Sequence, residues 1–295
     1  MSTPTTSSVP VADVTAPPAP QRPPLRRNPS RTLTPGLAGR VAVLAVATAL
    51  TLGPVVWTVW TSLSVRADGS PGAGFGAYAD VVDQVALGLL VWNSVLVTAL
   101  CAIGQMVTAA LAGYVFARVP FRGSGALFAV VLATMMVPLQ VTIVPVFMLV
   151  RGMGLSDTLL ALVLPAVPTA FGTFLMRQYF LGLPGELGEA AAIDGAGPLR
   201  TFTSVYAPLA APGLAIVGIL AFNYHWNEFF RPLILTVSEQ NFTLPLGLVT
   251  LQGNLGTGSV ATVLAGVVVS MVPALVVFVL GQRPLREGLT AGAGK

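Results

Sequence analysis

Side chains that could do chemistry are sparse in this chain, and most of them stand in two short stretches. The first is ELGEAAAIDGAGPLR, residues 186–200, which holds three of the eleven acidic residues: Glu186, Glu189 and Asp194. Carboxylates offer charged contacts to the basic groups of a partner, and small neighbours let a second backbone come close. The stretch therefore predicts an interaction surface, although a charged run is also typical of a linker that only faces water.

The second stretch lies inside an apolar run and holds Asn223, Trp226, Asn227 and Glu228. Residues three or four apart share one face of a helix, so these side chains would present amide, carboxylate and stacking groups together. Sugars prefer such groups, and ionisable residues within an apolar run mark functional sites. Gln140 is a second candidate for the same pathway. The alternative is that all five residues join helices or lie at the membrane interface.

The other reactive residues exclude most enzyme chemistry. Cys101 and His225 are the only residues of their kinds, which excludes an intramolecular disulfide, a cysteine zinc site and a histidine cluster around a metal. The phosphate-binding pattern G-x-x-x-x-G-K-[ST] does not occur, and no Ser–His–acid set is indicated. We therefore expect no catalytic residue, no metal site and no cofactor in this chain.

The composition of the chain indicates the environment in which these residues lie. The chain is 54% hydrophobic and only 9% charged, with a mean hydropathy of +0.81. A soluble domain carries about a quarter charged residues, so this chain reads as an integral protein of the lipid bilayer. Its net charge of +4 comes from bases that lie before and between apolar runs, which favours membrane orientation over nucleic-acid binding.

Six apolar runs are long enough to cross a bilayer, which takes about 20 residues as a helix. They cover residues 41–62, 89–112, 127–150, 158–176, 211–237 and 261–281. The predicted fold class is an all-α integral membrane protein with six transmembrane helices. Residues 39–282 would form the transmembrane domain, between a disordered Pro/Ser/Thr-rich tail at 1–38 and a C-terminal tail at 283–295.

The distribution of basic residues predicts the orientation. With the N-terminus inside, only Arg66, Arg151 and Arg231 of the fifteen basic residues would lie outside. Cytoplasmic loops carry an excess of Arg and Lys, so both termini are expected in the cytoplasm. Fourteen of the fifteen are arginine, a composition typical of a GC-rich bacterial genome. The acidic stretch then falls in the longest inner loop, residues 177–208.

This inner loop should contain two short helices. Pro184 and Gly185 precede residues of good helix propensity, and Gly195 followed by Gly197 would stop the helix. Pro198 can then open a second helix, because proline suits the first helical turn.

The acidic loop also carries a resemblance. It resembles the EAA loop of binding-protein-dependent ABC importer permeases in Glu189-Ala190-Ala191, Asp194-Gly195-Ala196 and Pro208-Leu209. Residues 226–233 (WNEFFRPL), 243–248 (TLPLGL) and 289–293 (LTAGA) resemble segments of the carbohydrate branch of these permeases, and Asn93-Ser94 fits as well. The resemblance covers about residues 89–295. Within this branch the chain is similar to the maltose-type second permease.

One position departs from the family pattern in an informative way. Arg231 lies where an apolar or aromatic residue is common. It could mark an unusual substrate, or it could pair with Glu228 three residues earlier.

The resemblance implies a type I importer permease fold in the bacterial cytoplasmic membrane and a transport subunit without its own ATPase site. The implied partners are a second permease, two cytosolic ATPase subunits that would bind the ATP, an extracellular or periplasmic solute-binding protein and a sugar. The residues that would couple to the ATPase are Glu186, Glu189, Ala190, Ala191, Asp194, Gly195 and Ala196.

Two alternative functions stay open at this point. The chain could serve an ABC importer for a non-sugar solute, or it could be an ATP-independent channel or secondary transporter. The latter should carry ionisable residues deep in several spans, whereas here only Glu228 and Arg231 qualify.

Overall fold

The computed structural model describes residues 35–66, 69–253 and 258–293, with side chains described in 39–66, 69–253 and 258–282. Within these ranges the regular secondary structure is helical throughout. The chain divides into two compact units, residues 1–51 and 52–295. The described part of the first unit is the beginning of α1, and everything below concerns the second unit unless α1 is named.

The first half of the chain contains seven longer helical elements and one short turn. Their bounds are α1 (Pro35–Ser62), α2 (Gly76–Gln84), α3 (Leu87–Arg118), α4 (Ser124–Thr134), α5 (Leu139–Gly152), α6 (Leu159–Val163), η1 (Leu164–Ala166) and α7 (Ala170–Gly182). The second half continues with α8 (Glu186–Ile193), α9 (Pro198–Thr201), η2 (Phe202–Tyr206), α10 (Ala207–Leu209), α11 (Ala211–Trp226), α12 (Phe230–Leu235), η3 (Glu239–Asn241), α13 (Leu244–Val249), η4 (Thr250–Gln252) and α14 (Val260–Ala293).

Three stretches are single helices long and apolar enough to cross a membrane: Gly39–Ser62, Leu87–Arg118 and Val260–Gln282. Three bent pairs meet the same test jointly. They are Ser124–Thr134 with Leu139–Gly152, bent by 99°, Leu159–Ala166 with Ala170–Gly182, bent by 43°, and Pro198–Leu209 with Ala211–Trp226, bent by 74°. If each pair is one span, the described residues hold up to six, which is consistent with the expected number.

The ends of α1 and α14 differ from the expected boundaries. α1 begins at Pro35, and the remainder of the predicted tail, residues 1–34, lies outside the described residues. α14 continues as a helix to Ala293, into the segment expected to be a tail.

The fifth predicted span also ends earlier than the hydropathy pattern indicates. α11 stops at Trp226, and α12 begins only at Phe230. Pro232 has no backbone N–H to donate to the carbonyl of Glu228 four residues earlier, so a continuous helix would lose a bond there. The break places Asn227 and Glu228 at a helix end instead of inside a helix.

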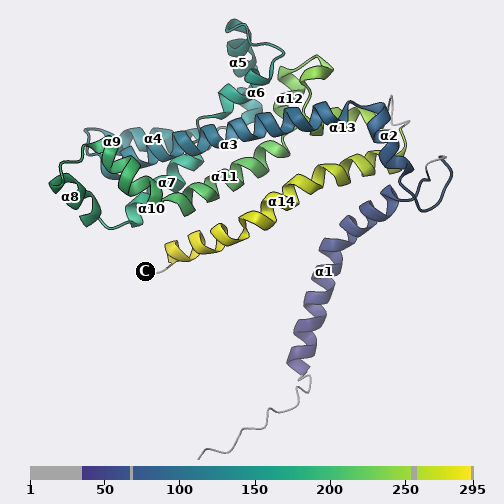
Figure 1. Ribbon diagram of the computed structural model, residues 1–295, viewed down its shortest axis with the longest axis horizontal. Coiled ribbons are helices and arrows are strands. Elements are labelled where there is room, and N and C mark those ends of the chain that lie inside the picture. The colour runs from purple at the N-terminus through teal and green to yellow at the C-terminus, as the bar shows by residue number, and fades with distance from the viewer. Residues whose placement is uncertain (1–34, 67–68, 254–257, 294–295) are drawn as a thin grey trace, which may run out of the picture. The chain divides into compact units, whose positions relative to one another are not determined.

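The centre of the second unit is a layer of long helices. α3 packs against α7 and α11, and α11 packs in turn against α14 (Figure 1). Gly113 permits a close approach of α3 and α7, because a Cβ atom there would lie 2.6 Å from Met176 Cβ and 2.8 Å from the backbone nitrogen of Arg177. Small residues at helix contacts are typical of membrane proteins, in which packing drives association.

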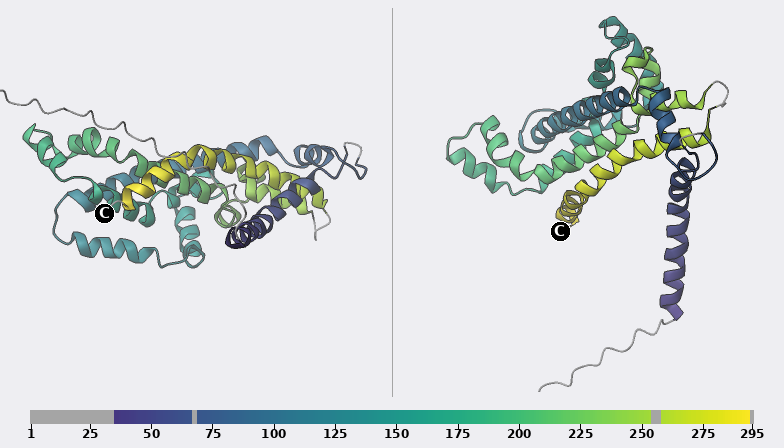
Figure 2. Two further views of the ribbon diagram at one scale, coloured as in Figure 1. Left: turned by 90° about the horizontal axis from the view of Figure 1, so that it is seen from below. Right: turned by 45° about the vertical axis from the view of Figure 1, so that its right-hand side comes forward.

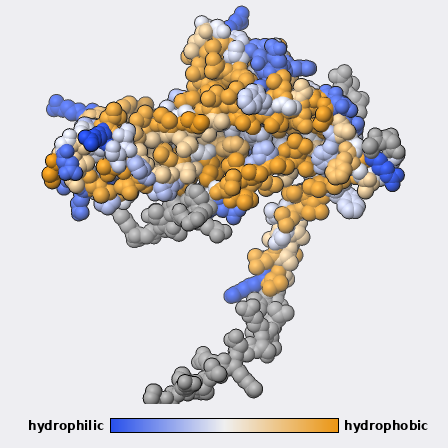
Figure 3. Space-filling view, viewed as in Figure 1, coloured by the Kyte–Doolittle hydropathy of each residue, from blue (hydrophilic) through white to orange (hydrophobic). Residues whose placement is uncertain are grey.

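The acidic loop and the segments α2 and α13 lie near opposite ends of this layer. α8 and α9 lie beside the C-terminal end of α3, whereas α2 and α13 lie near its N-terminal end, as Figures 1 and 2 both show. Apolar side chains dominate the surface along the layer, and hydrophilic ones gather toward its ends (Figure 3). This distribution is expected for helices that cross a bilayer with their loops in water.

Candidate functional site

The bend of the acidic loop is built by a glycine cap. Gly195 has a φ of 76°, a left-handed conformation that glycine adopts without a Cβ clash. Its N–H donates to the carbonyl of Ala192 at 3.0 Å, and the N–H of Ala196 donates to the carbonyl of Ala191 at 2.9 Å. These two bonds form a Schellman motif, which satisfies the last carbonyls of α8. The glycine, rather than the carboxylate of Asp194, therefore ends the helix.

The acidic side chains of this loop face solvent. Glu186, Glu189 and Asp194 are exposed, and no hydrogen bond or ion pair holds their carboxylates within the described part of the chain. The small residues differ in burial. Ala190 and Gly195 are exposed, Ala196 is partly buried and Ala191 is buried against the rest of the loop. The acidic groups are thus available to another molecule.

Sequence reasoning missed the apolar part of this surface. Ile193 is 87% exposed and Leu199 is 71% exposed, on the two sides of the Gly195 bend. Next to them is an open pocket of about 500 Å³ lined by Gly197, Pro198, Leu199, Arg200 and Thr203. The sequence already indicated this apolar surface, since Ile193 and Leu199 are large apolar residues in a loop predicted to face water.

An aromatic cluster fixes this loop to the membrane helices. The rings of Tyr114, Phe180, Phe202 and Tyr206 lie with centroids 5.0–6.4 Å apart. They come from α3, α7 and η2, and Tyr206 also meets α8, because a Cβ atom at Gly188 would lie only 2.8 Å from the Tyr206 hydroxyl oxygen. A force on α8 would therefore be passed to α3 and α7.

Arg118 closes the same cluster from the end of α3. Its guanidinium lies 5.1 Å from the centroid of the Tyr206 ring and donates to the carbonyls of Phe180 and Leu183. The cation thus binds at the C-terminal end of α7, where it shares the Phe180 carbonyl with the N–H of Leu183 and satisfies the carbonyl of Leu183 itself.

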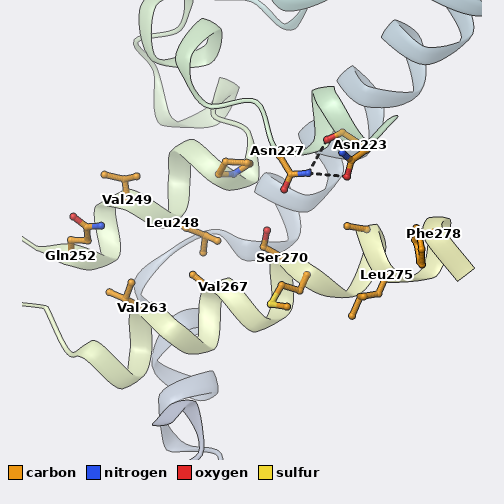
Figure 4. Close-up of a pocket in the computed structure, with 13 residues that line it drawn as sticks. Asn223, Asn227, Leu248, Val249, Gln252, Val263, Val267, Ser270, Leu275 and Phe278 are labelled. Atoms are coloured by element: carbon orange, nitrogen blue, oxygen red, sulfur yellow. Dashed lines mark hydrogen bonds between the residues drawn. The ribbon is translucent and has the colours of Figure 1, made fainter. Parts of the chain in front are cut away.

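A pocket of about 530 Å³ lies between α11, α13 and α14. Its polar lining residues are Asn223, Asn227, Ser270 and Gln252, and Gln252 lies at the other end of the pocket from the two asparagines (Figure 4). The Nδ2 of Asn227 donates to the backbone carbonyl of Asn223 at 2.8 Å. None of the thirteen residues that line this pocket is charged. Ser270 and Gln252 were not among the residues expected from the sequence.

The other residues of the expected pathway do not line this pocket. Trp226 is buried, stacks on Phe222 at 5.6 Å and donates its indole N–H to the carbonyl of Ser270 at 2.9 Å. Glu228 belongs to a buried ion pair with Arg231, with 2.9 Å between Oε1 and Nη2. Gln140 is exposed on α5. The structure therefore brings only Asn223 and Asn227 of the expected set to the pocket.

The Asn93-Ser94 pair anchors the segment that follows η3. Asn93 Nδ2 donates to the carbonyls of Gln240 and Phe242 at 2.8 and 3.0 Å, and Ser94 Oγ accepts from the N–H of Leu244 at 2.6 Å. These residues position a loop, and the sequence alone did not show this role.

Asp157 fastens a second loop at the end of α12. Its carboxylate accepts from the N–H of Val237 at 2.9 Å, from the N–H of Ser238 at 3.0 Å and from the Ser238 hydroxyl. The Ser238 hydroxyl and these two backbone donors hold the pKa of Asp157 well below its usual range.

No group of three or more His, Cys, Asp or Glu side chains that could hold a metal occurs in the described ranges.

Similarity to known proteins identifies the family of this chain. Residues 105–284 match the model of a family described as "Binding-protein-dependent transport system inner membrane component". The chain belongs to this family. It is a permease of the inner, cytoplasmic membrane.

Curated relatives of the permease act on different solutes. It is 36% identical over 203 residues to the arabinooligosaccharides transport system permease protein AraQ of Halalkalibacterium halodurans, covering 69% of this chain and 72% of the relative. It is 35% identical over 208 residues to the sn-glycerol-3-phosphate transport system permease protein UgpE of Agrobacterium fabrum, covering 70% and 73%.

A solved structure shares the fold of the permease. It is a crystal structure of a bacterial ABC transporter involved in the import of the acidic polysaccharide alginate, with a TM-score of 0.76 and 23% identity. The match covers 87% of this chain and 99% of the other chain. The all-α importer permease fold expected from the sequence is thereby confirmed.

Proposed function

We propose that this permease forms half of the translocation pathway of an ATP-driven importer for a neutral sugar or oligosaccharide, and that the α8–α9 loop couples it to a cytosolic ATPase subunit. The observation that carries the proposal is the exposed surface of this loop. It presents carboxylates that no other described residue binds, beside two exposed apolar side chains, on a loop that the aromatic cluster ties to α3 and α7.

The loop has the composition of a docking surface. Exposed apolar anchors surrounded by polar groups are typical of the centres of protein interfaces. In this proposal Ile193 and Leu199 fill a cleft of the ATPase, while Glu186, Glu189 and Asp194 face its basic groups. Ala190 and Ala196 permit close approach, and Ala191 supports α8 from beneath.

The uncharged pocket supports a neutral substrate. Amide and hydroxyl groups at Asn223, Asn227, Gln252 and Ser270 can exchange hydrogen bonds with sugar hydroxyls. A solute such as glycerol 3-phosphate carries negative charge, for which this lining has no cation. Arg231, the nearby candidate, is buried and occupied by Glu228.

The proposal includes partners that supply what this chain lacks. A second permease would complete the pathway and part of the binding site. Two ATPase subunits would bind and hydrolyse the ATP, and an external solute-binding protein would deliver the sugar.

The test is co-purification of the tagged full chain from its native membrane, followed by identification of the proteins that accompany it. We expect an ATPase and a second permease with the wild type, and loss of the ATPase alone in Glu189→Arg and in Ile193→Asp. Glu239→Arg is the matched control, since Glu239 is also exposed but lies in η3 near the other end of α3.

A wild-type chain that purifies alone and moves solute into liposomes without ATP would support the channel or secondary-transporter alternative instead. Retention of the ATPase by both loop variants would show that α8 is not the coupling element.

A further inference from the structure

A chain of buried polar side chains crosses the break between α11 and α12. His225 Nδ1 lies 3.0 Å from Glu228 Oε2, and Glu228 Oε1 lies 2.9 Å from Arg231 Nη2. The second guanidinium nitrogen of Arg231, Nη1, donates to the carbonyl of Leu162 in α6 at 2.8 Å. The side chains of these three polar residues are each at most 10% exposed.

Gln105 of α3 extends this series of polar side chains and determines which nitrogen of the His225 imidazole carries the proton. Its Nε2 lies 2.7 Å from the carbonyl of Ala166 and 2.9 Å from His225 Nε2. An amide nitrogen only donates, so His225 Nε2 accepts and the imidazole proton is on Nδ1, from which it is donated to Glu228. The links from Gln105 to His225 and from His225 to Glu228 then each have one donor and one acceptor, and the link from Glu228 to Arg231 is an ion pair.

These polar side chains donate to backbone carbonyls at an interrupted helix. The span formed by α6, η1 and α7 breaks at Pro168, which leaves the carbonyls of Ala166 and Val167 at a helix end. Gln105 satisfies the first, and the Thr108 hydroxyl donates to the second at 3.0 Å. Broken helices at membrane depth are tolerated where neighbouring side chains satisfy the freed backbone groups.

We propose that Gln105, His225, Glu228 and Arg231 are positioning residues that lock α3, the half-span α6–η1 and the α11–α12 junction into one unit that moves together during transport. The network consists of these four residues and is called the polar lock below. It accounts for Arg231 by the pairing with Glu228 that the spacing of the two residues suggested. The inference goes beyond the proposed function, because it requires neither a particular sugar nor a particular ATPase.

Cys101, the only cysteine of the chain, gives a direct readout of the polar lock. It is completely buried, and its Sγ lies 4.0 Å from the same Leu162 carbonyl that accepts from Arg231. If α3 and the half-span α6–η1 separate, the thiol of Cys101 becomes accessible to N-ethylmaleimide. A matched reporter is Ala210→Cys in a Cys101→Ser background, since Ala210 is equally buried but lies in the hydrophobic core around Tyr206, away from the polar lock.

The experiment measures maleimide labelling rates in the full chain, purified in detergent with the subunits that accompany it and without nucleotide or substrate. In Arg231→Met we expect Cys101 to react roughly tenfold faster or more, because removal of one partner leaves a buried carboxylate unpaired. The Ala210→Cys reporter should keep its rate. The double variant Glu228→Gln/Arg231→Met should react more slowly than Arg231→Met but faster than the wild type, since the unpaired carboxylate is gone while the bond from Arg231 to the Leu162 carbonyl stays lost.

Two further variants complete the design. Arg151→Met removes an exposed arginine from the last turn of α5 and should leave both labelling rates unchanged. If Arg231→Met does not fold, Gln105→Leu tests the same lock without creating an unpaired charge, and it should raise the Cys101 rate severalfold.

Three results would overturn the inference. The first is an unchanged Cys101 rate in the single variants, and the second is equal acceleration of both reporters. The third is a double variant that returns fully to the wild-type rate, because the bond from Arg231 to Leu162 would then hold nothing in place. None of these outcomes depends on sugar uptake or ATPase binding, so failure of the polar lock is distinguishable from failure of the proposed function.

Discussion

At the scale of single residues, polar side chains in this permease mostly hold backbone groups in place. Asn93, Asp157 and Arg118 each bond backbone groups of segments far away in the sequence. Membrane helices gain little from the hydrophobic effect among themselves, so such bonds and close packing determine how they associate. A polar residue near a span is therefore as often a structural tie as a substrate contact.

Asp157 permits a test of such a tie. Replacement by Asn keeps the shape and tolerates the φ of 56°, but it places an NH2 group where Oδ2 accepts from the Ser238 hydroxyl. It also removes the negative charge that strengthens the bonds from the N–H groups of Val237 and Ser238 to Oδ1. We expect Asp157→Asn to lower the midpoint temperature of unfolding at pH 7 and to speed protease cleavage near Ser238 severalfold.

The same residue predicts a pH dependence. A carboxyl group whose pKa is depressed in the folded protein adds stability above its unfolded pKa of about 4, and this stability is lost as pH falls toward the folded value. The difference between wild type and Asp157→Asn should be constant from pH 8 to about 5 and shrink only below about 4. A difference that instead changed near neutral pH would contradict the assignment to this carboxylate.

At the scale of elements, the short helices were predicted better than the long spans. The α8 and α9 boundaries follow from Gly195 and Pro198, because glycine caps and N-terminal prolines act locally. The 99° bend at Pro138 and the end of α11 at Trp226 did not follow from the sequence. Hydropathy is the same for a straight and a broken span, and only tertiary contacts such as those of Arg231 and Gln105 distinguish them.

The bend between α8 and α9 predicts a clear contrast between two glycines. Gly195→Ala forces a Cβ into the left-handed region, at a cost of about 1–2 kcal/mol. Gly197 has a φ of −72° and open space around it, so Gly197→Ala should be neutral. We expect Gly195→Ala to weaken co-purification of the ATPase severalfold, whereas Gly195→Asn retains most of it, because Asn tolerates this conformation. Equal effects of the two alanine variants would show that the bend itself is unimportant.

At the scale of the whole molecule, composition alone identified a membrane protein and the EAA-like loop identified its class. The pathway residues were harder to assign, because Asn223 and Glu228 lie close together in the sequence, but Asn223 lies on α11 and Glu228 lies in the break after it. One lines the pocket and the other forms the polar lock. Whether a side chain lines a pocket depends on the three-dimensional packing of the helices. Spacing along one helix limits the candidates but does not identify the residue.

The orientation of the permease stays a prediction that labelling can test. In a Cys101→Ser background, Ala73→Cys lies in the loop after α1 and Ala190→Cys lies in α8, both exposed. The bias of arginines places them on opposite sides of the membrane. A membrane-impermeant maleimide added to intact cells should label only Ala73→Cys and should label both after lysis. The reverse pattern in intact cells would invert the topology.

The exposed pair Ile193 and Leu199 also bears on how cells regulate the amount of this protein. Both side chains belong to a loop expected to face the cytosol, and Ile193 is the most exposed large apolar side chain in the described residues. A copy made without its ATPase would display this patch to chaperones and proteases, which act on exposed apolar surface. Quality control would then remove orphan copies, so assembly itself would match the number of permeases in the membrane to the supply of the ATPase.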